Sequence, residues 1–463
     1  MNNAETFEQK PTFTVMVKKT LFFTLPIIFS SILQLIYNSA DLVIVGRFGG
    51  DNALASVGAT ISLFNLITAL FLGLSVGVNI CASFYIGSDD RKNASEVSHT
   101  AVCTALLLGV TISVFGFFLS PVLLNILRTP KDGGVFDGAV LYMRICFIGM
   151  PASLMYNYCS ALLKSLGDTR RPFIYLMISG MVNIALNLMF VLVLDMTVDG
   201  VAYATVLSQT LSAVLTLIRL FRYDSYFKLS PRKMKLSYHK FIRIIALGLP
   251  AGIQSAAFSL SNVFFQSAVN SFGIYAISGM SAVNTFDDIT YQSVYAFQDA
   301  AVTFTSNSMG AKKYSSIKTI FLATSLLSVL TGLLAGWTIL IFDEPLLSLF
   351  IPDSPKAMSY ALERIWTTMP LYFIPGIMCT SSATLRGMGK SIQPSIITVV
   401  GVCVTRIVWL YTVFAAKPSI RTLFLSYPVT WTIVTVSFCF LLFRYLRKMK
   451  KKGIIDGIPI KQN

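Results

Sequence analysis

One acidic residue interrupts an apolar stretch near the start of the chain. Asp41 lies in YNSADLVIVG, Tyr37 to Gly46, which continues an otherwise uncharged run that begins at Leu21. Ionisable side chains inside a membrane span cost at least ~2.5 kcal/mol at the helix centre and are therefore functional candidates. A carboxylate there suits two chemistries, because its oxygens bind a hard cation such as Na⁺, and a desolvated carboxylate takes up a proton. The residues leave both open.

A second polar set lies in NTFDDITYQSVYAFQDAAVTFTSN, around residue 292. Four of its side chains, spaced 4, 3 and 4 apart, share one helical face. These are Asp288, Gln292, Tyr295 and Asp299. Facing a substrate cavity, the stripe would attract cations, and Tyr291 would add cation–π contact. Alternatively, Asp287 and Asp288 pair with Arg406 of a later span and hold the helices together, and we keep both interpretations.

The elements that carry these residues must be membrane helices. The 463-residue chain is 54% hydrophobic and only 13% charged, with a mean hydropathy of +0.69, which leaves too little polar surface for a water-soluble fold. Twelve apolar stretches are centred near residues 32, 68, 108, 150, 183, 210, 255, 292, 328, 370, 402 and 434. Their continuous runs exclude the alternating segments of a membrane barrel. The sequence predicts an all-α polytopic membrane protein.

The distribution of Lys and Arg predicts the orientation. Of the 37 basic residues, seven fall in one set of loops and two, Arg144 and Arg406, in spans, so the other 28 accompany the termini and the loops on their side. The positive-inside rule therefore predicts that both termini lie on the cytoplasmic side of the cell's inner membrane. The net charge of +16 reflects topology and anionic lipid contact, and no nucleic-acid partner is expected.

The two halves of the chain repeat each other. LPIIFSSILQLIYNSADLVIVGRFGG, from Leu25, aligns with LPAGIQSAAFSLSNVFFQSAVNSFGI, from Leu249, at an offset of 224. SALLKSLGDTRRP aligns with SATLRGMGKSIQP at an offset of 222. Six spans per half give parallel repeats, the arrangement in which transporters place their sites between lobes. We predict a cytoplasmic segment 1–19, an N-lobe 20–222, a linker 223–239, a C-lobe 240–446 and a basic tail 447–463.

The repeat also tests which polar residues the scaffold needs. The counterpart of Asp41 is Phe265, so the acid is not required for packing. Asn183 and Asn187, at i and i+4 on one helix face, correspond to Thr405 and Trp409, and Thr205 corresponds to Val429. One half has therefore gathered a carboxylate, two amides and a hydroxyl.

Pro26 and Pro250 occupy equivalent points in the first span of each half. A proline inside a helix removes a hydrogen bond and kinks it. We interpret each either as a static kink, which membrane helices tolerate, or as a hinge.

These features resemble the multidrug and toxic compound extrusion (MATE) transporters. The resemblance is carried by the first span, P…Q..YNSADLVIVG..G, by the GSDD and GAKK turns and by SLGDTRRP, and it covers roughly residues 20 to 445. It implies that Asp41, Asn183, Asn187 and Thr205 form a cation or proton site, and that Gln34 joins the substrate cavity. The norfloxacin-exporter branch of the family carries acids in the seventh and tenth spans, and the spans of this chain near residues 255 and 370 have none. The chain therefore resembles the DinF-like side of the family more.

The resemblance implies an antiporter, acting as a monomer, that exports amphipathic, cationic compounds in exchange for Na⁺ or H⁺. No cofactor is expected, and no metal beyond Na⁺ at Asp41. The alternatives are a lipid-linked oligosaccharide flippase of similar layout and, in another class, a membrane-embedded enzyme, for which the sequence shows no catalytic arrangement. The seven cysteines lie in apolar runs without CxxC spacing and are expected to be core residues.

Overall fold

The computed structural model describes residues 12–127, 129–223, 227, 229–352 and 354–451. Within these ranges the chain forms helices and no strands. It divides into two compact units, which are described separately below: unit 1 contains Met1–Ile28 and Ile253–Asn463, and unit 2 contains Phe29–Gly252.

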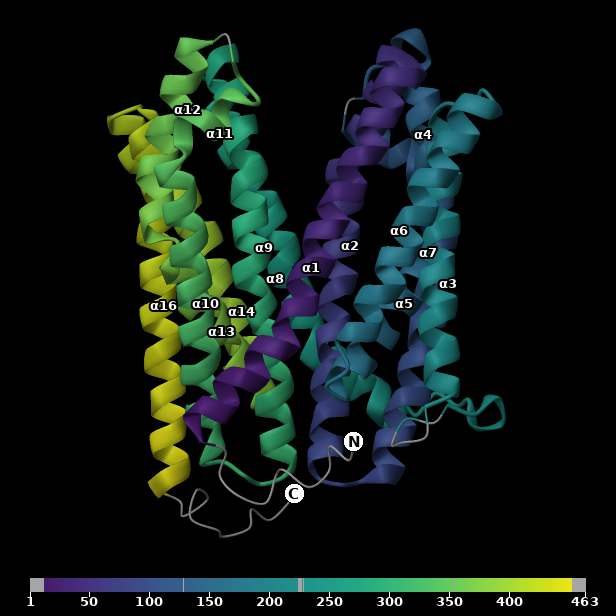
Figure 1. The fold of residues 1–463 in the computed structure, drawn as a ribbon, viewed down its shortest axis with the longest axis vertical. Helices are drawn as coiled ribbons and strands as arrows, with labels where there is room; N and C mark the ends of the chain where they lie inside the picture. The colour runs from purple at the N-terminus through teal and green to yellow at the C-terminus, as the bar shows by residue number, and fades with distance from the viewer. Residues whose placement is uncertain (1–11, 128, 224–226, 228, 353, 452–463) are drawn as a thin grey trace. The chain divides into compact units, whose positions relative to one another are not determined.

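Unit 2 is built from helices that the first half of the chain supplies (Figure 1). Its elements are the second part of α1 (Phe13–Ile44), η1 (Val45–Gly49), α2 (Gly50–Gly87), α3 (Arg91–Ile126), η2 (Asp132–Gly134), α4 (Val135–Ile148), α5 (Met150–Ser165), α6 (Arg170–Leu188), η3 (Met189–Val193), α7 (Val198–Phe221), η4 (Pro231–Lys233) and the first part of α8 (Tyr238–Asn270).

Unit 1 repeats the pattern with the second half. Its elements are the first part of α1, the remainder of α8, α9 (Ile274–Gly310), α10 (Ser316–Ile341), α11 (Asp343–Ser348), α12 (Pro355–Thr368), η5 (Met369–Leu371), α13 (Phe373–Gly387), α14 (Ile392–Thr398), η6 (Val399–Val404), α15 (Thr405–Trp409), η7 (Leu410–Phe414) and α16 (Ile420–Lys451).

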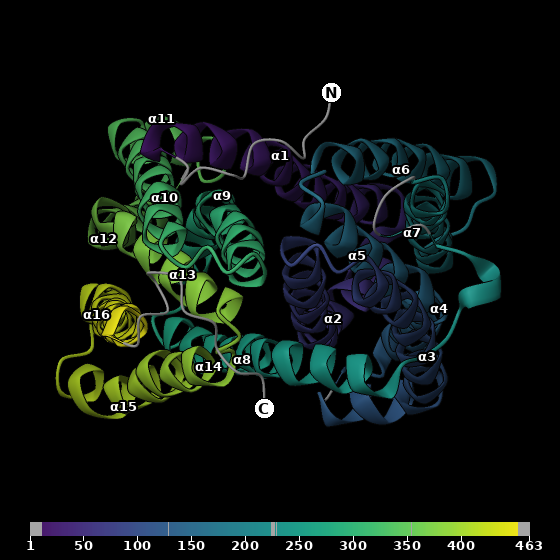
Figure 2. The same ribbon diagram turned by 90° about the horizontal axis from the view of Figure 1, so that it is seen from below.

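Equivalent helices of the two repeats are central in the two units. In unit 2, α5 contacts α2, α3 and α7, and in unit 1, α13 contacts α9, α10 and α16 (Figure 2). These two helices carry the aligned SALLKS and SATLRG segments. Five of the seven cysteines are buried, and all seven thiols are free, so they pack as small core residues.

The described helices account for the predicted membrane spans. Nine are long and apolar enough to cross a membrane, and α4 with α5, bent by 45° at Gly149, makes a tenth. The other two predicted spans are α9 and the α12–α13 stretch, whose ionisable residues, among them Asp287, Asp288 and Arg364, lower their hydropathy. The all-helical, two-lobe fold class is thus confirmed.

Two helices divide their length between the units. α1 contains Pro26 and α8 contains Pro250, and the unit boundaries fall two residues after each proline, at 28/29 and 252/253. The first part of α1 packs on unit 1, where the Phe23 and Phe304 ring centroids are 5.0 Å apart. By packing, residues 20–28 therefore belong to unit 1 and residues 240–252 to unit 2.

A glycine-lined contact holds the first part of α8 within unit 2. Gly73 and Gly77 of α2 face Gly248 and Gly252 of α8. A Cβ at Gly73 would lie 2.1 Å from the Gly252 backbone nitrogen, and one at Gly77 would lie 2.3 Å from the Ile244 carbonyl oxygen. Small residues four apart let membrane helices approach this closely. α8 therefore packs tightly on α2 directly before residue 253, where the part of α8 that belongs to unit 1 begins.

The segment that leads into α8 is bound to the end of α3. His99 is 3% exposed, and its Nε2 accepts a hydrogen bond from the Ser230 backbone N–H at 3.1 Å. Its Nδ1 lies 2.7 Å from the Ser95 carbonyl oxygen and donates to it. Lys240 Nζ donates to the Tyr85 hydroxyl at 2.8 Å. His99 is thus a satisfied structural residue.

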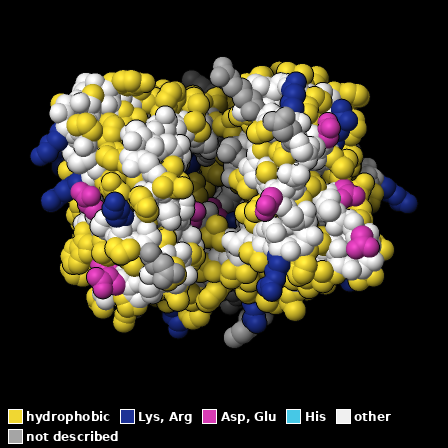
Figure 3. Space-filling model, turned by 90° about the horizontal axis from the view of Figure 1, so that it is seen from above, with side chains coloured by type: hydrophobic (Ala, Val, Ile, Leu, Met, Phe, Trp, Pro, Cys, Tyr) yellow, Lys and Arg dark blue, Asp and Glu magenta, His cyan; other side chains and the backbone are white. Residues whose placement is uncertain are grey.

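Few charged side chains lie at the helix ends away from the α2–α3 turn in unit 2, or at those away from the α9–α10 turn in unit 1 (Figure 3). Hydrophobic and uncharged side chains predominate there, and Lys, Arg, Asp and Glu are scattered (Figure 3). The positive-inside rule predicts that these are the extracytoplasmic ends.

Candidate functional site

The position of Asp41 follows from how α1 packs on α6. Gly180 of α6 has no side chain, and the Tyr37 ring occupies the space that a Cβ would fill, 1.9 Å from the ideal Cβ position. The Tyr37 hydroxyl donates a hydrogen bond to the Met177 carbonyl oxygen at 3.3 Å. One helical turn after Tyr37, Asp41 therefore lies beside the continuation of α6.

Asn183 and Asn187 project from one face of α6 and are 5% and 0% exposed. Asn187 Nδ2 donates to Asp41 Oδ1 at 2.5 Å and lies 3.3 Å from Asn183 Oδ1. Thr205 of α7 has its Oγ1 3.3 Å from Asp41 Oδ2 and 2.9 Å from the Val201 carbonyl oxygen. Its single proton serves one of these acceptors at a time. The structure thus brings together all four residues of the predicted coupling site.

Irregular backbone accompanies these side chains. The π-helical segment η1 follows Asp41 by four residues, and η3 follows Asn187 by two. Such π-bulges are rare and frequently occur at functional sites. Ile44, Val191 and Val201, from α1, η3 and α7, are buried together in one apolar cluster of unit 2.

The donors at this site fit a small hard cation. They comprise one carboxylate, one hydroxyl and two amides, whose oxygens are of the type preferred by hard cations. In this structure Asn187 presents its Nδ2 to Asp41, so its Oδ1 would face a cation bound there only after the amide rotates. Asn187 Oδ1 is buried and has no hydrogen-bond partner among the described residues, and buried polar atoms of this kind call for an unseen partner. No basic side chain in the described part of the chain forms an ion pair with Asp41, so its charge is available to a cation or proton.

The predicted substrate residues do not form a single cluster in either unit. Gln34 is exposed on α1 in unit 2, whereas the other five belong to unit 1. On α9, Asp288 is exposed, and Gln292, Tyr295 and Asp299 are partly buried. The Tyr295 hydroxyl accepts from Gln298 Nε2 at 2.8 Å.

The structure shows no ion pair between Arg406 and Asp287 or Asp288 among the described residues, so the interpretation that paired them is not supported. Asp287 Oδ2 accepts from Arg364 at 3.1 Å, and its Oδ1 accepts from the Tyr372 hydroxyl at 2.8 Å. Arg364 also donates to Asn284 Oδ1 at 2.7 Å. Among the described residues Arg406 forms no ion pair, and its guanidinium lies 3.7 Å from the Tyr427 ring centroid.

Arg364 was overlooked because we counted it among the seven basic residues of the loops opposite the termini. α12 begins at Pro355, and its N-cap Ser354 accepts from the Ala357 N–H at 3.4 Å. A serine N-cap followed by proline at the first helical position is a helix-start signal, and this signal could have placed Arg364 on a helix. Arg386 of α13 is a second overlooked residue: it is 2% exposed and donates to Gln254 Oε1 at 2.5 Å.

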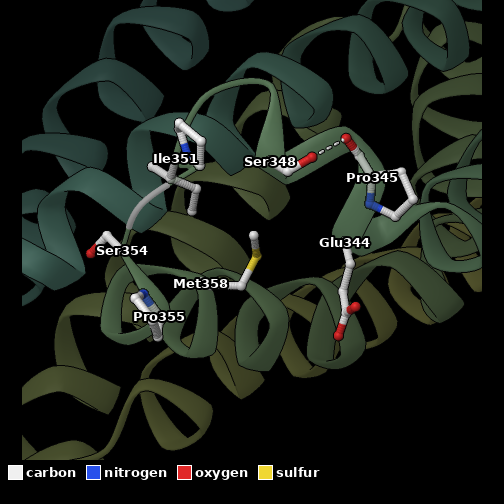
Figure 4. A pocket seen from close by; sticks show the side chains of 8 residues that line it. Glu344, Pro345, Ser348, Ile351, Ser354, Pro355 and Met358 are labelled. Atoms are coloured by element: carbon white, nitrogen blue, oxygen red, sulfur yellow. Dashed lines mark hydrogen bonds between the residues drawn. The ribbon is translucent and has the colours of Figure 1, made fainter.

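A cavity of about 500 Å³ lies between α11 and the start of α12 in unit 1. Figure 4 shows Met358 and Ile351 directed into it and Ser348 donating to the Pro345 carbonyl oxygen. Among the described residues that line it, Glu344 is the one ionisable side chain. None of the predicted site residues lines this cavity, and it has no convergent polar groups, so we assign it no role in transport.

Comparison with models of known protein families shows to which family this chain belongs. The family model MatE matches the chain twice, over residues 26–189 and 250–412. The chain belongs to the MatE family. The two matches begin 224 residues apart, at 26 and 250, so they also confirm the internal repeat. MatE proteins are multi-pass membrane transporters, so the prediction that the chain is not an enzyme is confirmed. That the chain lies on the DinF-like side of the family stays a prediction.

Two curated relatives extend over most of the chain. "Probable multidrug resistance protein YoeA" of Bacillus subtilis (strain 168) is 27% identical over 386 residues, covering 81% of this chain and 82% of the relative. "Probable multidrug resistance protein NorM" of Thermotoga maritima is 24% identical and covers 84% of both chains.

Solved structures share the fold. "Outward-facing conformation of a multidrug resistance MATE family transporter of the MOP superfamily" matches with a TM-score of 0.87 at 21% identity, covering 96% of this chain and 100% of the other. "Reverse polarity of binding pocket suggests different function of a MOP superfamily transporter from Pyrococcus furiosus Vc1 (DSM3638)" matches with a TM-score of 0.83 at 21% identity, covering 96% and 99%.

Proposed function

We propose that this MatE protein is a secondary active antiporter that exports amphipathic, cationic compounds in exchange for Na⁺ or H⁺. The observation that carries the proposal is the half-buried Asp41, held by Asn187 and Thr205 and without a basic partner among the described residues. The names of the curated relatives support multidrug export.

The coupling ion and the exported compound compete for one carboxylate in this mechanism. Na⁺ would bind Asp41 together with the Asn183, Asn187 and Thr205 oxygens, whereas H⁺ would bind one carboxylate oxygen. Inward movement of either ion contributes ~2.3 kcal/mol per charge per 100 mV of membrane potential, besides its concentration gradient. Neutralisation of Asp41 by the ion would release a cationic compound.

We propose that Pro26 and Pro250 act as hinges for this exchange. Each proline removes one backbone hydrogen bond and so weakens its helix locally. The unit boundaries lie two residues beyond each proline, so bending there would change the relation between the parts of α1 and α8 that pack on different units. We further propose that the protein acts as a monomer in the cell membrane with both termini cytoplasmic, and that Asp288, Gln292, Tyr295 and Asp299 line the path of the substrate together with Gln34.

Ethidium efflux from energised membrane vesicles tests the function. Wild type, Asp41→Asn and the control Asp51→Asn, an exposed acid at the start of α2, are compared with either a Na⁺ or an H⁺ gradient imposed. Efflux that follows one gradient, disappears in Asp41→Asn and persists in Asp51→Asn would establish the antiporter and name its ion. Full efflux by Asp41→Asn at normal expression would refute the mechanism. If neither gradient drives efflux in the wild type, flipping of a lipid-linked oligosaccharide is the activity to assay.

A further inference from the structure

Arg406 of α15 is a buried cation without a polar partner. The residue is 3% exposed, its Nε has no hydrogen-bond partner, and no hydrogen bond or ion pair connects it to another described residue. Buried charges in proteins are normally paired and hydrogen-bonded. Contact with the Tyr427 ring at 3.7 Å offsets part of this cost but satisfies none of the five N–H donors.

The nearby carboxylate of Asp287 does not serve as the missing partner. Both of its oxygens already accept hydrogen bonds, one from Tyr372 and one from Arg364. Arg364, by contrast, has three oxygen acceptors in unit 1, the Met280 carbonyl, Asn284 and Asp287. The two arginines of this region therefore differ: the Nε of each is unpaired, but the terminal nitrogens of Arg364 have three acceptors, whereas Arg406 has no hydrogen-bond acceptor among the described residues.

The position of Arg406 in the repeat indicates a ligand site. At the offset of 222, Asn183 corresponds to Thr405, so Arg406 is one residue beyond the counterpart of a predicted coupling residue. α15 lies between two π-helical segments, η6 and η7, and η3 follows the coupling segment of α6 in the same way. π-bulges are frequently found at functional sites, and here they flank the unsatisfied guanidinium.

The surroundings of Arg406 suit a flat aromatic body. Tyr427 lies over the guanidinium, with ring centroids 5.0 Å from Phe265, 5.7 Å from Phe424 and 5.7 Å from Trp431. Tyr427 is only partly buried, whereas Phe265, Phe424 and Trp431 around it are 4%, 2% and 6% exposed. A planar guanidinium binds a carboxylate through two parallel hydrogen bonds.

We propose that Arg406 binds the carboxylate of aromatic ligands in unit 1. This inference rests on the proposed transport function and extends its substrates beyond cationic compounds to aromatic carboxylates. Unit 1 would thus have an anion-binding residue beside the position at which unit 2 has its cation-binding set.

Calorimetric titration of the purified full-length protein in detergent tests this directly. The probes are 2-naphthoate and its neutral analogue 2-naphthamide. Because a hydrogen-bonded charge contributes ~1.5–3 kcal/mol, the wild type should bind the carboxylate at least about tenfold more tightly than the amide. Arg406→Gln should abolish the preference, and Arg406→Lys should retain part of it because the charge remains without the planar fork.

Arg144→Gln is the matched control, since this arginine also lies within a span but donates to the Phe117 carbonyl oxygen at 3.4 Å, and it should keep the full preference. A wild type that does not distinguish the two probes, or an Arg406→Gln variant that binds the amide normally and still prefers the carboxylate, would overturn the proposal. Ethidium efflux separates the two ideas: a wild type that shows gradient-driven efflux but does not prefer the carboxylate refutes this site and leaves the antiporter standing.

Discussion

Removing one partner of the Arg364–Asp287 contact should strongly destabilise unit 1. The Arg364 side chain is 5% exposed and that of Asp287 is 23% exposed, so both charges are largely removed from water. Removing one partner of a buried ion pair typically costs 3–5 kcal/mol, because the other charge is left uncompensated. In Arg364→Gln, Asp287 keeps only the Tyr372 hydroxyl, and its partial exposure reduces the penalty, so we expect a loss of about 3 kcal/mol.

A double-mutant cycle separates this pairing from the packing of each side chain. Asp287→Asn leaves the guanidinium with neutral acceptors, and Arg364→Gln/Asp287→Asn removes both charges. The double variant should therefore be more stable than the sum of the single changes implies, with a coupling energy of about 1.5–3 kcal/mol. Equilibrium unfolding in mixed micelles of SDS, followed by circular dichroism, measures each free energy.

The Arg171–Asp168 pair is the matched control. It has a shorter separation, 2.6 Å, but the Arg171 side chain is 42% exposed, and exposed pairs contribute at most ~1 kcal/mol. Arg171→Gln should thus cost far less than Arg364→Gln, although its ion pair is shorter. Equal losses for the two variants, or simple additivity in the Arg364 cycle, would refute the reasoning that burial decides the strength of these contacts.

Three further predictions concern unit 2. Gly252→Ala places a Cβ 2.2 Å from a backbone carbonyl oxygen of α2, so it should destabilise the protein by about 1–3 kcal/mol in the same unfolding assay. The control is Gly58→Ala, whose Cβ would have no atom within 4 Å and which should not destabilise the protein. Thr205→Val keeps the shape but removes one hydrogen bond to the candidate site, so the half-saturating concentration of the coupling ion should rise about fivefold; an unchanged value would exclude Thr205 from the site. Asp90 is the N-cap of α3, and hydrogen bonds from the Asn93 side chain and backbone N–H lower its pKa below 3.8. The stabilisation from these bonds is present above pH 3.8 and is lost as the pH falls through the folded-state pKa. Asp90→Ala should therefore cost about 0.5–1 kcal/mol at pH 7, and its difference in stability from the wild type should shrink in acid.

Much of the fold could be predicted because hydropathy is a local signal. A span needs ~20 apolar residues wherever it packs, so the twelve stretches were visible in the sequence and the repeat paired them. The division of α1 and α8 between units could not be predicted in this way, since a proline marks a weak point in a helix but does not say which neighbours each part will contact. The early start of α12 was missed because Arg364 lowers local hydropathy.

The candidate site illustrates the same limit. Asp41, Asn187 and Thr205 were selected because the second half of the chain lacks equivalents, and a residue that a scaffold can omit is free to carry function. Partner choice is different, because it depends on where long side chains reach in three dimensions. Arg406 and Arg364 were equally available in sequence to the α9 acids, and only the packing of α12 against α9 assigns Asp287 to Arg364.

The contrast between the halves suggests how one scaffold divides two tasks. Both halves present polar side chains next to π-helical segments at corresponding points, η3 after Asn187 and η7 after Trp409. In unit 2 the group there is an acid without a base, which suits exchange of a cation. In unit 1 the acid is already neutralised by Arg364, and an arginine remains without an acceptor. If both proposals made above hold, this divergence would allow one half to bind the driving ion and the other to bind a different chemical group of the exported compound.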